Sequence, residues 1–468
     1  MFVISQRLSK YKKLKSVLII TLLVFVSLIF FFKTYTPPTK LLLILFCITI
    51  LSFLILDFKV VYTIFILSFF LEFGIYYFYL PTLIFPFVAL SFIINYTFRY
   101  SEIKNQIFYY FLLFFITIIP SYFPAIRHPE SYFISYNLLA FVVILLITPF
   151  IFKKLDNVLS VGVTYLVGCS FNAIYLIIMS LITGKRAFGF AGIMYVDLVG
   201  VGIIIAFSSL LFFKKFRSLS GIITMLLIVA LIFTQTRNSW ISTGLVILML
   251  TVYYIVKNKK FKIPDVYNVK KLVLVVLSII VIISIIGIAN PNVFSRVSET
   301  KSQSTEELAV TMDFGSIATR FFIWKIAYSV FEANPIIGTG FHSFRFISYD
   351  YSNLDPFLYD TFVKNLTPHT TILALLADTG IIGFLGFVIF MFLTIKFFKE
   401  NLKLSITQNQ KILSFILFWC QIYILISMIM TDAWLWGTLH MLWAVILGIS
   451  VFLRSEINKS TALSSFSD

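Results

Sequence analysis

Long continuous runs of apolar residues alternate with short polar segments along most of the chain. A membrane-spanning helix needs about 17–25 apolar residues, whereas a membrane β-barrel alternates apolar and polar positions over about ten residues. The runs are continuous, which favours helices and excludes a barrel. The pattern predicts helices at residues 17–33, 41–56, 60–73, 81–98, 107–123, 133–152, 158–182, 193–213, 218–235, 239–256, 272–289, 370–395, 411–430 and 437–453.

These helices predict an all-α, polytopic integral membrane protein with about 12–14 transmembrane helices. The least regular stretch is 60–98, which fits either two short helices broken at Gly74 and Pro81 or one span followed by a re-entrant piece. The first apolar run follows several basic residues, but no small-residue cleavage site comes after it, so we expect it to be retained as a helix.

One polar segment, residues 290–367, is much longer than the others and carries most of the acids expected on the outer side. Within it, residues 317–333 have the period of an amphipathic helix, and Asn334-Pro335 ends that helix. Gly338 and Gly340 indicate a turn after it. We expect its apolar face to consist mostly of Phe321, Trp324, Ile326, Ala327 and Val330.

The chain therefore divides into N-terminal transmembrane helices (1–217), a region that contains one long ordered extracytoplasmic loop (218–395, loop 290–368), and C-terminal transmembrane helices with a cytoplasmic tail (396–468). No internal repeat or low-complexity linker separates these parts.

Composition and charge agree with a membrane protein. Of the 468 residues, 60% are hydrophobic and only 12% are charged, which excludes a soluble globule or a coiled coil. A net charge of +17 in a soluble domain would suggest nucleic acid. Here about two thirds of the 37 basic residues lie at the helix ends on the side of the N-terminus. By the positive-inside rule, both termini are predicted to be cytoplasmic, and no nucleic-acid partner is expected.

Several familiar catalytic patterns do not occur. The sequence lacks a His-Glu-x-x-His zinc motif, a phosphate-binding Gly-Lys-Ser/Thr loop and an Asp-x-Asp pair. Cys47, Cys169 and Cys420 lie in apolar runs without disulfide or metal-ligand spacing, so they are interpreted as core residues. We expect no metal and no cofactor. A metal-dependent nucleotide-sugar enzyme is disfavoured, and the donor of a transferase would already be activated in the membrane.

Four basic residues on the predicted outer side could bind an anion. Arg237 lies in Thr234-Gln235-Thr236-Arg237-Asn238-Ser239, the short polar segment that separates the apolar runs 218–235 and 239–256. A cation at this depth either reaches toward headgroups or faces a polar cavity. Arg320 follows Ser316-Ile317-Ala318-Thr319 and could form a surface salt bridge or bind phosphate in a bidentate fork. Lys185 and Arg186 could contact lipid headgroups or an anionic substrate.

All four histidines fall on the outer half of the chain: His128, His342, His369 and His440. His369, in Pro368-His369-Thr370-Thr371, lies where the long loop re-enters the membrane. A histidine there is either an ordinary loop residue or a general base. The other three are interpreted as structural, and His440, inside the last helix, is expected to form a hydrogen bond in the core.

Five short motifs follow one another in order. They are Thr-Gln-Thr-Arg237, Ala318-Thr319-Arg320-Phe321-Phe322-Ile323-Trp324, Asn334-Pro335-Ile336-Ile337-Gly338-Thr339-Gly340, Pro368-His369-Thr370-Thr371-Ile372-Leu373 and Asp378-Thr379-Gly380-Ile381-Ile382-Gly383. Over residues 218–395 this series resembles the O-antigen ligase and polymerase superfamily of bacterial surface-polysaccharide assembly.

The resemblance implies a glycosyltransferase of the bacterial plasma membrane that uses an undecaprenyl-diphosphate-linked glycan on the periplasmic or extracellular side. It implies that Arg237 and Arg320 bind the donor diphosphate, with Lys185 and Arg186 nearby, and that His369 activates the acceptor hydroxyl without a metal. The acceptor would be a glycan, a lipid such as the lipopolysaccharide core, or a protein. The sequence departs from the family at Thr370, where members carry Asn, and at 191–197, where members carry Asn-Pro-Asn.

Three functions remain open: a ligase, a polymerase that joins lipid-linked repeat units, and a flippase or transporter without chemistry. Transport would predict internal two-fold repeats or charged residues deep within helices, and we find neither in the sequence. The Thr-Gln-Thr-Arg break and the position of Arg320 favour a ligase over a polymerase.

Overall fold

The computed structural model describes residues 58–71, 74–75, 78–95, 105–125, 130–152, 154–183, 187, 195–261, 316–431 and 437–464. These residues form helices and one short antiparallel pair, in which β1 (Gly74–Ile75) lies beside β2 (Phe78–Tyr79). The helices predicted at 17–33, 41–56 and 272–289 lie outside the described residues, as does Cys47.

Every helix predicted within the described part of the chain is present. The helices of the bundle are α3 (Phe58–Ser68), α4 (Leu80–Asn95), α5 (Gln106–Ala125), α6 (Glu130–Ile151), α7 (Leu155–Thr183), α8 (Tyr195–Phe212), α9 (Arg217–Phe233), α10 (Arg237–Phe261), α17 (Thr371–Leu404), α18 (Gln408–Met430) and α19 (Gly437–Ser464). A short 3-10 turn, η2 (Lys214–Phe216), precedes α9.

The all-α, polytopic membrane fold is therefore confirmed. Among the described residues, eight helices are long and apolar enough to cross a membrane, and α4 and α6 contain shorter apolar segments. Between residues 60 and 98, α3 and α4 are separate helices on either side of the β1–β2 pair, which agrees with the first of the two interpretations of that stretch.

The centre of the bundle is aromatic. Phe390 of α17 stacks on Phe114 of α5, with ring centroids 5.9 Å apart, and also contacts Trp443 of α19 at 5.5 Å. His440 is buried and stacks on Phe141 at 4.4 Å, so its interpretation as a core residue is confirmed. Cys169 and Cys420 are buried and not oxidised to a disulfide, as expected for core cysteines.

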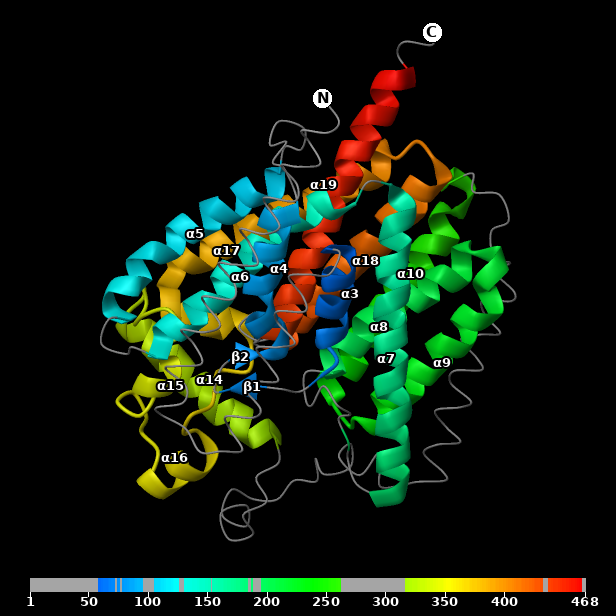
Figure 1. Ribbon diagram of the computed structural model, residues 1–468. Coiled ribbons are helices and arrows are strands. Elements are labelled where there is room, and N and C mark those ends of the chain that lie inside the picture. The colour runs from blue at the N-terminus through cyan, green and yellow to red at the C-terminus, as the bar shows by residue number, and fades with distance from the viewer. Residues whose placement is uncertain are drawn as a thin grey trace, which may run out of the picture.

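The segment that the sequence predicts on the outer side is described from residue 316 to residue 370, and we call this part the outer segment. It contains three helices: α14 (Ser316–Ala333), α15 (Phe344–Ile347) and α16 (Pro356–Phe362). They gather at one end of the bundle, and the C-terminal end of α19 projects from the other (Figure 1). A second apolar core joins this segment to α17; it consists of Ile323, Ile326, Ala327, Val330, Phe344, Tyr359 and Val363 of the segment and Ala377 of α17.

The helix predicted at 317–333 is thus present, but its buried face differs from the prediction. Ile326, Ala327 and Val330 are buried as expected, whereas Phe321 is 63% exposed and Trp324 is 41% exposed. The helical period places Phe321 and Trp324 near the buried face of the helix, but it does not determine whether their aromatic side chains are buried.

The outer segment is attached to the membrane bundle at an interruption in α17. Gly380 has φ 62° and ψ −166°, which breaks the helix in its first third. The break separates the carbonyls of Ala377 and Asp378 from the amides of Ile381 and Ile382, which an uninterrupted helix would join.

Residues 335–340, which we call the clamp segment, supply all four replacement bonds. The amides of Thr339 and Gly340 donate to the carbonyls of Ala377 and Asp378 at 3.1 and 3.0 Å. The amides of Ile381 and Ile382 donate to the carbonyls at positions 335 and 336, at 2.9 and 3.3 Å. Non-helical backbone at membrane depth is tolerated only where the protein satisfies its polar groups, and here it does.

The Asp378 carboxylate adds a side-chain contact to this attachment. It is buried, and its Oδ1 accepts a hydrogen bond from the amide of Phe344 at 2.9 Å, at the start of α15. The clamp segment and the turn after it are therefore both bound to α17.

Two glycines make the close contact possible. Gly338 has φ 68°, and a Cβ at this position would lie 2.4 Å from the backbone of Asp378. A Cβ at Gly380 would lie 2.4 Å from the carbonyl oxygen of Ile336. Both positions therefore require a residue without a side chain, in a conformation that only glycine adopts freely.

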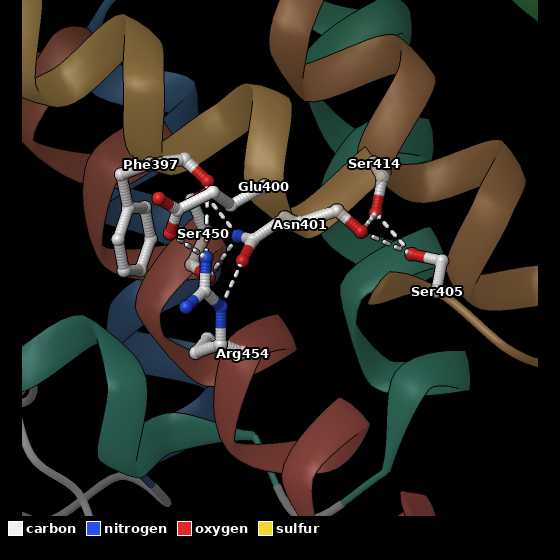
Figure 2. A network of polar contacts seen from close by, with 7 residues as sticks. All are labelled: Phe397, Glu400, Asn401, Ser405, Ser414, Ser450 and Arg454. Atoms are coloured by element: carbon white, nitrogen blue, oxygen red, sulfur yellow. Dashed lines mark hydrogen bonds and ion pairs between the residues drawn. The ribbon is translucent and has the colours of Figure 1, made fainter. Parts of the chain in front are cut away.

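A polar network joins three helices at the other end of the bundle. Figure 2 shows Arg454 of α19 beside α17, where its guanidinium pairs with Glu400 at 3.1 Å and donates to Asn401 and to the carbonyl of Phe397. Asn401 also donates to Ser450, and its carbonyl accepts from Ser405 and Ser414 near the start of α18. The ends of α17, α18 and α19 are thus bound together by polar contacts.

Replacing Gly338 by alanine is expected to destabilise the folded protein, because a left-handed conformation costs a non-glycine residue about 1–2 kcal/mol and the new methyl group would also meet rigid backbone. Gly244→Ala is the matched control, since no heavy atom lies within 4 Å of the place that its new methyl group would take. The measurement is the thermal unfolding midpoint in detergent. We expect Gly338→Ala to lower it by several degrees and Gly244→Ala to leave it unchanged or raise it; equal midpoints for the two variants would contradict the clamp.

Candidate functional site

Three consecutive carbonyls at the outer end of α18 bind side chains from two other helices. The Ile429 carbonyl accepts from the Thr370 hydroxyl at 3.0 Å, and the Met430 carbonyl accepts from the Asn238 amide at 2.8 Å. The Thr431 carbonyl accepts from both the backbone amide and the hydroxyl of Thr371, at 3.2 and 3.0 Å. The last carbonyls of a helix have no partner within it, and these bonds satisfy them.

The N-terminal ends of α10 and α17 therefore meet at the C-terminal end of α18. We call this meeting point the outer junction. Two of the predicted site residues lie where these helices begin, and the third, Arg320, belongs to α14, which packs against α17.

Arg237 is the first residue of α10 and is half-buried. The predicted break before it is present, because α9 ends at Phe233 and Gln235 takes a left-handed conformation with φ 51°. The Trp240 indole donates to the Leu231 carbonyl at 2.8 Å, which holds the two sides of the break together. The direction of the chain at Arg237 is thus fixed by backbone and side-chain contacts.

Arg320 reaches the same place from the outer segment. Its Nη1 donates to the Oδ1 of Asn238 at 3.1 Å, and Asn238 in turn donates to Met430. Asn238 therefore holds the guanidinium of α14 at the residue next to Arg237. The contact connects the outer segment, α10 and α18 in one hydrogen-bonded series.

His369 lies between two fixed neighbours. Before it, the Pro368 carbonyl accepts from the indole of Trp324 at 2.9 Å; after it, Thr370 is bound to α18. His369 is half-buried and has φ 54°, a left-handed conformation that is uncommon outside glycine and clusters at functional sites. The surrounding contacts hold the backbone in this conformation.

The structure thus brings Arg237, Arg320 and His369 to the outer junction, on three different elements. Lys185 and Arg186 lie outside the described residues. Arg237 is the first residue of α10, and the Arg320 guanidinium is bound to Asn238 in the same turn, so two cationic residues add to the partial positive charge of a helix N-terminal end. Such an arrangement favours an anionic ligand.

The residues that hold the site together are not identified by the sequence. In the sequence, Asn238 is only one of several polar residues around Arg237. Trp324 is predicted to be buried by the amphipathic period. Thr370 and Thr371 are notable only for their place beside His369. A polar residue directly after an arginine in a helix break is a signal that could identify Asn238; the partner of Trp324 has no signal in the sequence.

Of the other histidines, His128 lies outside the described residues. His342 is buried in the turn after the clamp segment, with φ 56°. Within the described residues, no group of three or more His, Cys, Asp or Glu side chains is arranged to hold a metal ion.

Comparison with known families agrees with the resemblance drawn from the motifs. A family model described as O-antigen ligase matches residues 222–388, from α9 to the part of α17 beyond its interruption. The match includes Arg237, Arg320, His369 and the clamp segment. No curated protein matches the chain. The chain therefore carries, over residues 222–388, a region that matches the O-antigen ligase family.

Proposed function

We propose that the protein is a membrane glycosyltransferase that moves an undecaprenyl-diphosphate-linked glycan onto an acceptor hydroxyl at the outer face of the bacterial plasma membrane. The observation that supports this function is the outer junction, where hydrogen bonds hold Arg320 and the residues that directly follow Arg237 and His369 at the end of α18. The family match adds that such proteins belong to O-antigen assembly.

Arg237 and Arg320 would bind the diphosphate of the donor. A guanidinium group presents paired N–H donors that match two phosphate oxygens, and it remains charged at any physiological pH. When the bond between sugar and diphosphate breaks, negative charge develops on the leaving group. Fixed positive groups stabilise that charge without reorganising, which is the largest contribution in many enzymes.

His369 would act as the general base. It would accept the proton of the acceptor hydroxyl while the oxygen attacks the anomeric carbon from the side opposite the diphosphate, which inverts the configuration. The attack forms the new glycosidic bond, and the diphosphate leaves with the bonding electron pair. The fixed neighbours of His369 suit this role, because general-base catalysis requires an accurately placed group.

We prefer a ligase to a polymerase because of the Thr-Gln-Thr-Arg break and the position of Arg320. The two enzymes differ in the acceptor, which for a polymerase is another lipid-linked repeat unit. The test uses purified full-length protein in detergent with EDTA, an undecaprenyl-diphosphate-linked oligosaccharide, and a lipid A-core acceptor that is present or omitted. We expect transfer only when the second acceptor is present. Growth of the lipid-linked glycan without it would identify a polymerase, and flipping in vesicles without any transfer would contradict the enzyme.

Removing either arginine is expected to lower transfer by about 100- to 1,000-fold, as does the loss of one preorganised charge-stabilising donor in other enzymes. The variants are Arg237→Ala and Arg320→Ala, measured by initial transfer rates at equal protein in the membrane. Lys364→Ala is the control, because Lys364 is an exposed cation of the outer segment that pairs with Asp360.

Arg320→Lys tests the bidentate contact separately. Lysine keeps the charge but cannot present the planar pair of donors, and it cannot bind Asn238 and a phosphate in the same geometry. We therefore expect a rate between those of the wild type and Arg320→Ala. Full activity in Arg320→Lys would contradict bidentate binding of the diphosphate.

Replacing His369 by asparagine is expected to reduce the transfer rate by about 100- to 10,000-fold, the usual contribution of a general base. Asparagine tolerates the left-handed backbone at this position, so the substitution removes the base with little strain. The thermal midpoint, measured in parallel, should match the wild type. A wild-type transfer rate in His369→Asn would remove this residue from the chemistry.

A further inference from the structure

Two cavities of different character adjoin at the end of the bundle away from the outer junction. One has a volume of about 650 Å³ and lies between α7, α8, α9, α18 and α19, with an almost entirely apolar lining. The other has a volume of about 310 Å³, and its lining includes the polar residues Lys214, Lys215, Gln408 and Asn409. Phe213 and Phe216 belong to the walls of both cavities.

The apolar cavity has the shape and lining for a hydrocarbon chain. Along α7 it extends from Val158 to Ile174, which is about 24 Å at 1.5 Å per residue. Its volume falls within the range of about 300–1,000 Å³ that is typical of small-molecule sites. Water is a poor occupant, because it needs two to four polar partners and this lining provides few.

The polar cavity has the charge for an anionic headgroup. Lys214 and Lys215 form the 3-10 turn between α8 and α9, and both side chains are exposed. The Lys215 ammonium lies 5.6 Å from the ring centroid of Phe216, at the wall shared with the apolar cavity. Basic residues next to a membrane surface attract anionic lipids, which are concentrated in the cytoplasmic leaflet. The positive-inside rule assigns this end of the bundle to that leaflet.

We propose that the two cavities form one binding site for an anionic glycerophospholipid. Its phosphate lies beside Lys214 and Lys215, its glycerol at the level of Phe213 and Phe216, and an acyl chain in the apolar cavity along α7. The occupant is inferred from charge complementarity in one cavity and apolar lining in the other, on the two sides of the wall that Phe213 and Phe216 share. The site and the outer junction lie toward opposite ends of α18: Leu413, near its start, lines the cavity, and Met430, its last residue, lies at the junction. The proposal therefore stands apart from the glycosyltransferase function.

The headgroup contact is tested by native mass spectrometry of the full-length protein in detergent. Phosphatidylglycerol and phosphatidylethanolamine with the same acyl chains are titrated separately, and the apparent Kd of the first bound lipid is compared. We expect the wild type to prefer phosphatidylglycerol and the double variant Lys214→Ala/Lys215→Ala to weaken its binding at least fivefold. Lys396→Ala/Lys399→Ala, which removes two exposed lysines of α17, should keep the wild-type preference.

The acyl-chain contact is tested by filling the cavity. Gly162 lines it, and no heavy atom lies within 4 Å of the position of a Cβ there, so Gly162→Leu adds a side chain without a clash at its first atom. We expect this variant to weaken binding of both lipids. Gly244→Leu is the control, because Gly244 has equally open surroundings but does not line the cavity.

Three outcomes would overturn the proposal. If both double-lysine variants weakened phosphatidylglycerol binding equally, the lipid would respond only to the general surface charge of the protein. Unchanged lipid binding in Gly162→Leu would mean that the cavity holds something other than the acyl chain. Tighter binding of undecaprenyl phosphate than of phosphatidylglycerol would assign the site to a polyprenyl lipid. The lysine variants change exposed residues, so their result does not depend on whether Gly162→Leu folds.

Discussion

The organisation of the outer half of the protein depends on four backbone hydrogen bonds between the clamp segment and the interruption of α17. In a membrane bundle an interrupted helix is costly, because the separated amides and carbonyls have no water to bind. Here the four separated groups of α17 are joined to residues 335, 336, 339 and 340. The interruption and the clamp segment are therefore each stable only in the presence of the other. This makes the outer segment part of the membrane domain and not an appended loop.

α14 transmits this attachment to the outer junction through contacts at three places along its length. Near its start, Arg320 binds Asn238 of α10, and in its middle Trp324 binds the Pro368 carbonyl beside His369. Beyond its end, the clamp segment binds α17. The residues proposed to bind diphosphate and to accept a proton are thus positioned relative to one another by a single helix. A displacement of α14 would move Arg320 and the loop of His369 together.

Much of the fold follows from the sequence, because each helix of the membrane bundle in the described part coincides with an apolar run, and α14 coincides with the amphipathic period of residues 317–333. The clamp could not be predicted in the same way. Its bonds join backbone to backbone, and such bonds leave no side-chain pattern. The clamp is reflected in the sequence only by two glycines, Gly338 and Gly380, which occur in two separate motifs. Each must be glycine because the backbone of the other motif lies against it. The wrong face assigned to Trp324 has a similar origin, since periodicity measures apolar character and takes no account of an indole N–H that binds a distant carbonyl.

The candidate residues Arg237, Arg320 and His369 can be identified in the sequence because each is a polar residue in an unusual place, and the family resemblance links them. Their proximity comes from the helix ends. The C-terminal end of α18 alone would repel a diphosphate, because its last carbonyls carry partial negative charge. Those carbonyls are engaged by donors from Asn238, Thr370 and Thr371. The Thr370 hydroxyl, bound to Ile429, forms no cap on α17, so it does not occupy the amides of the first turn. With the negative helix end engaged and two positive helix ends beside two arginine residues, the junction suits the departing diphosphate of the proposed reaction.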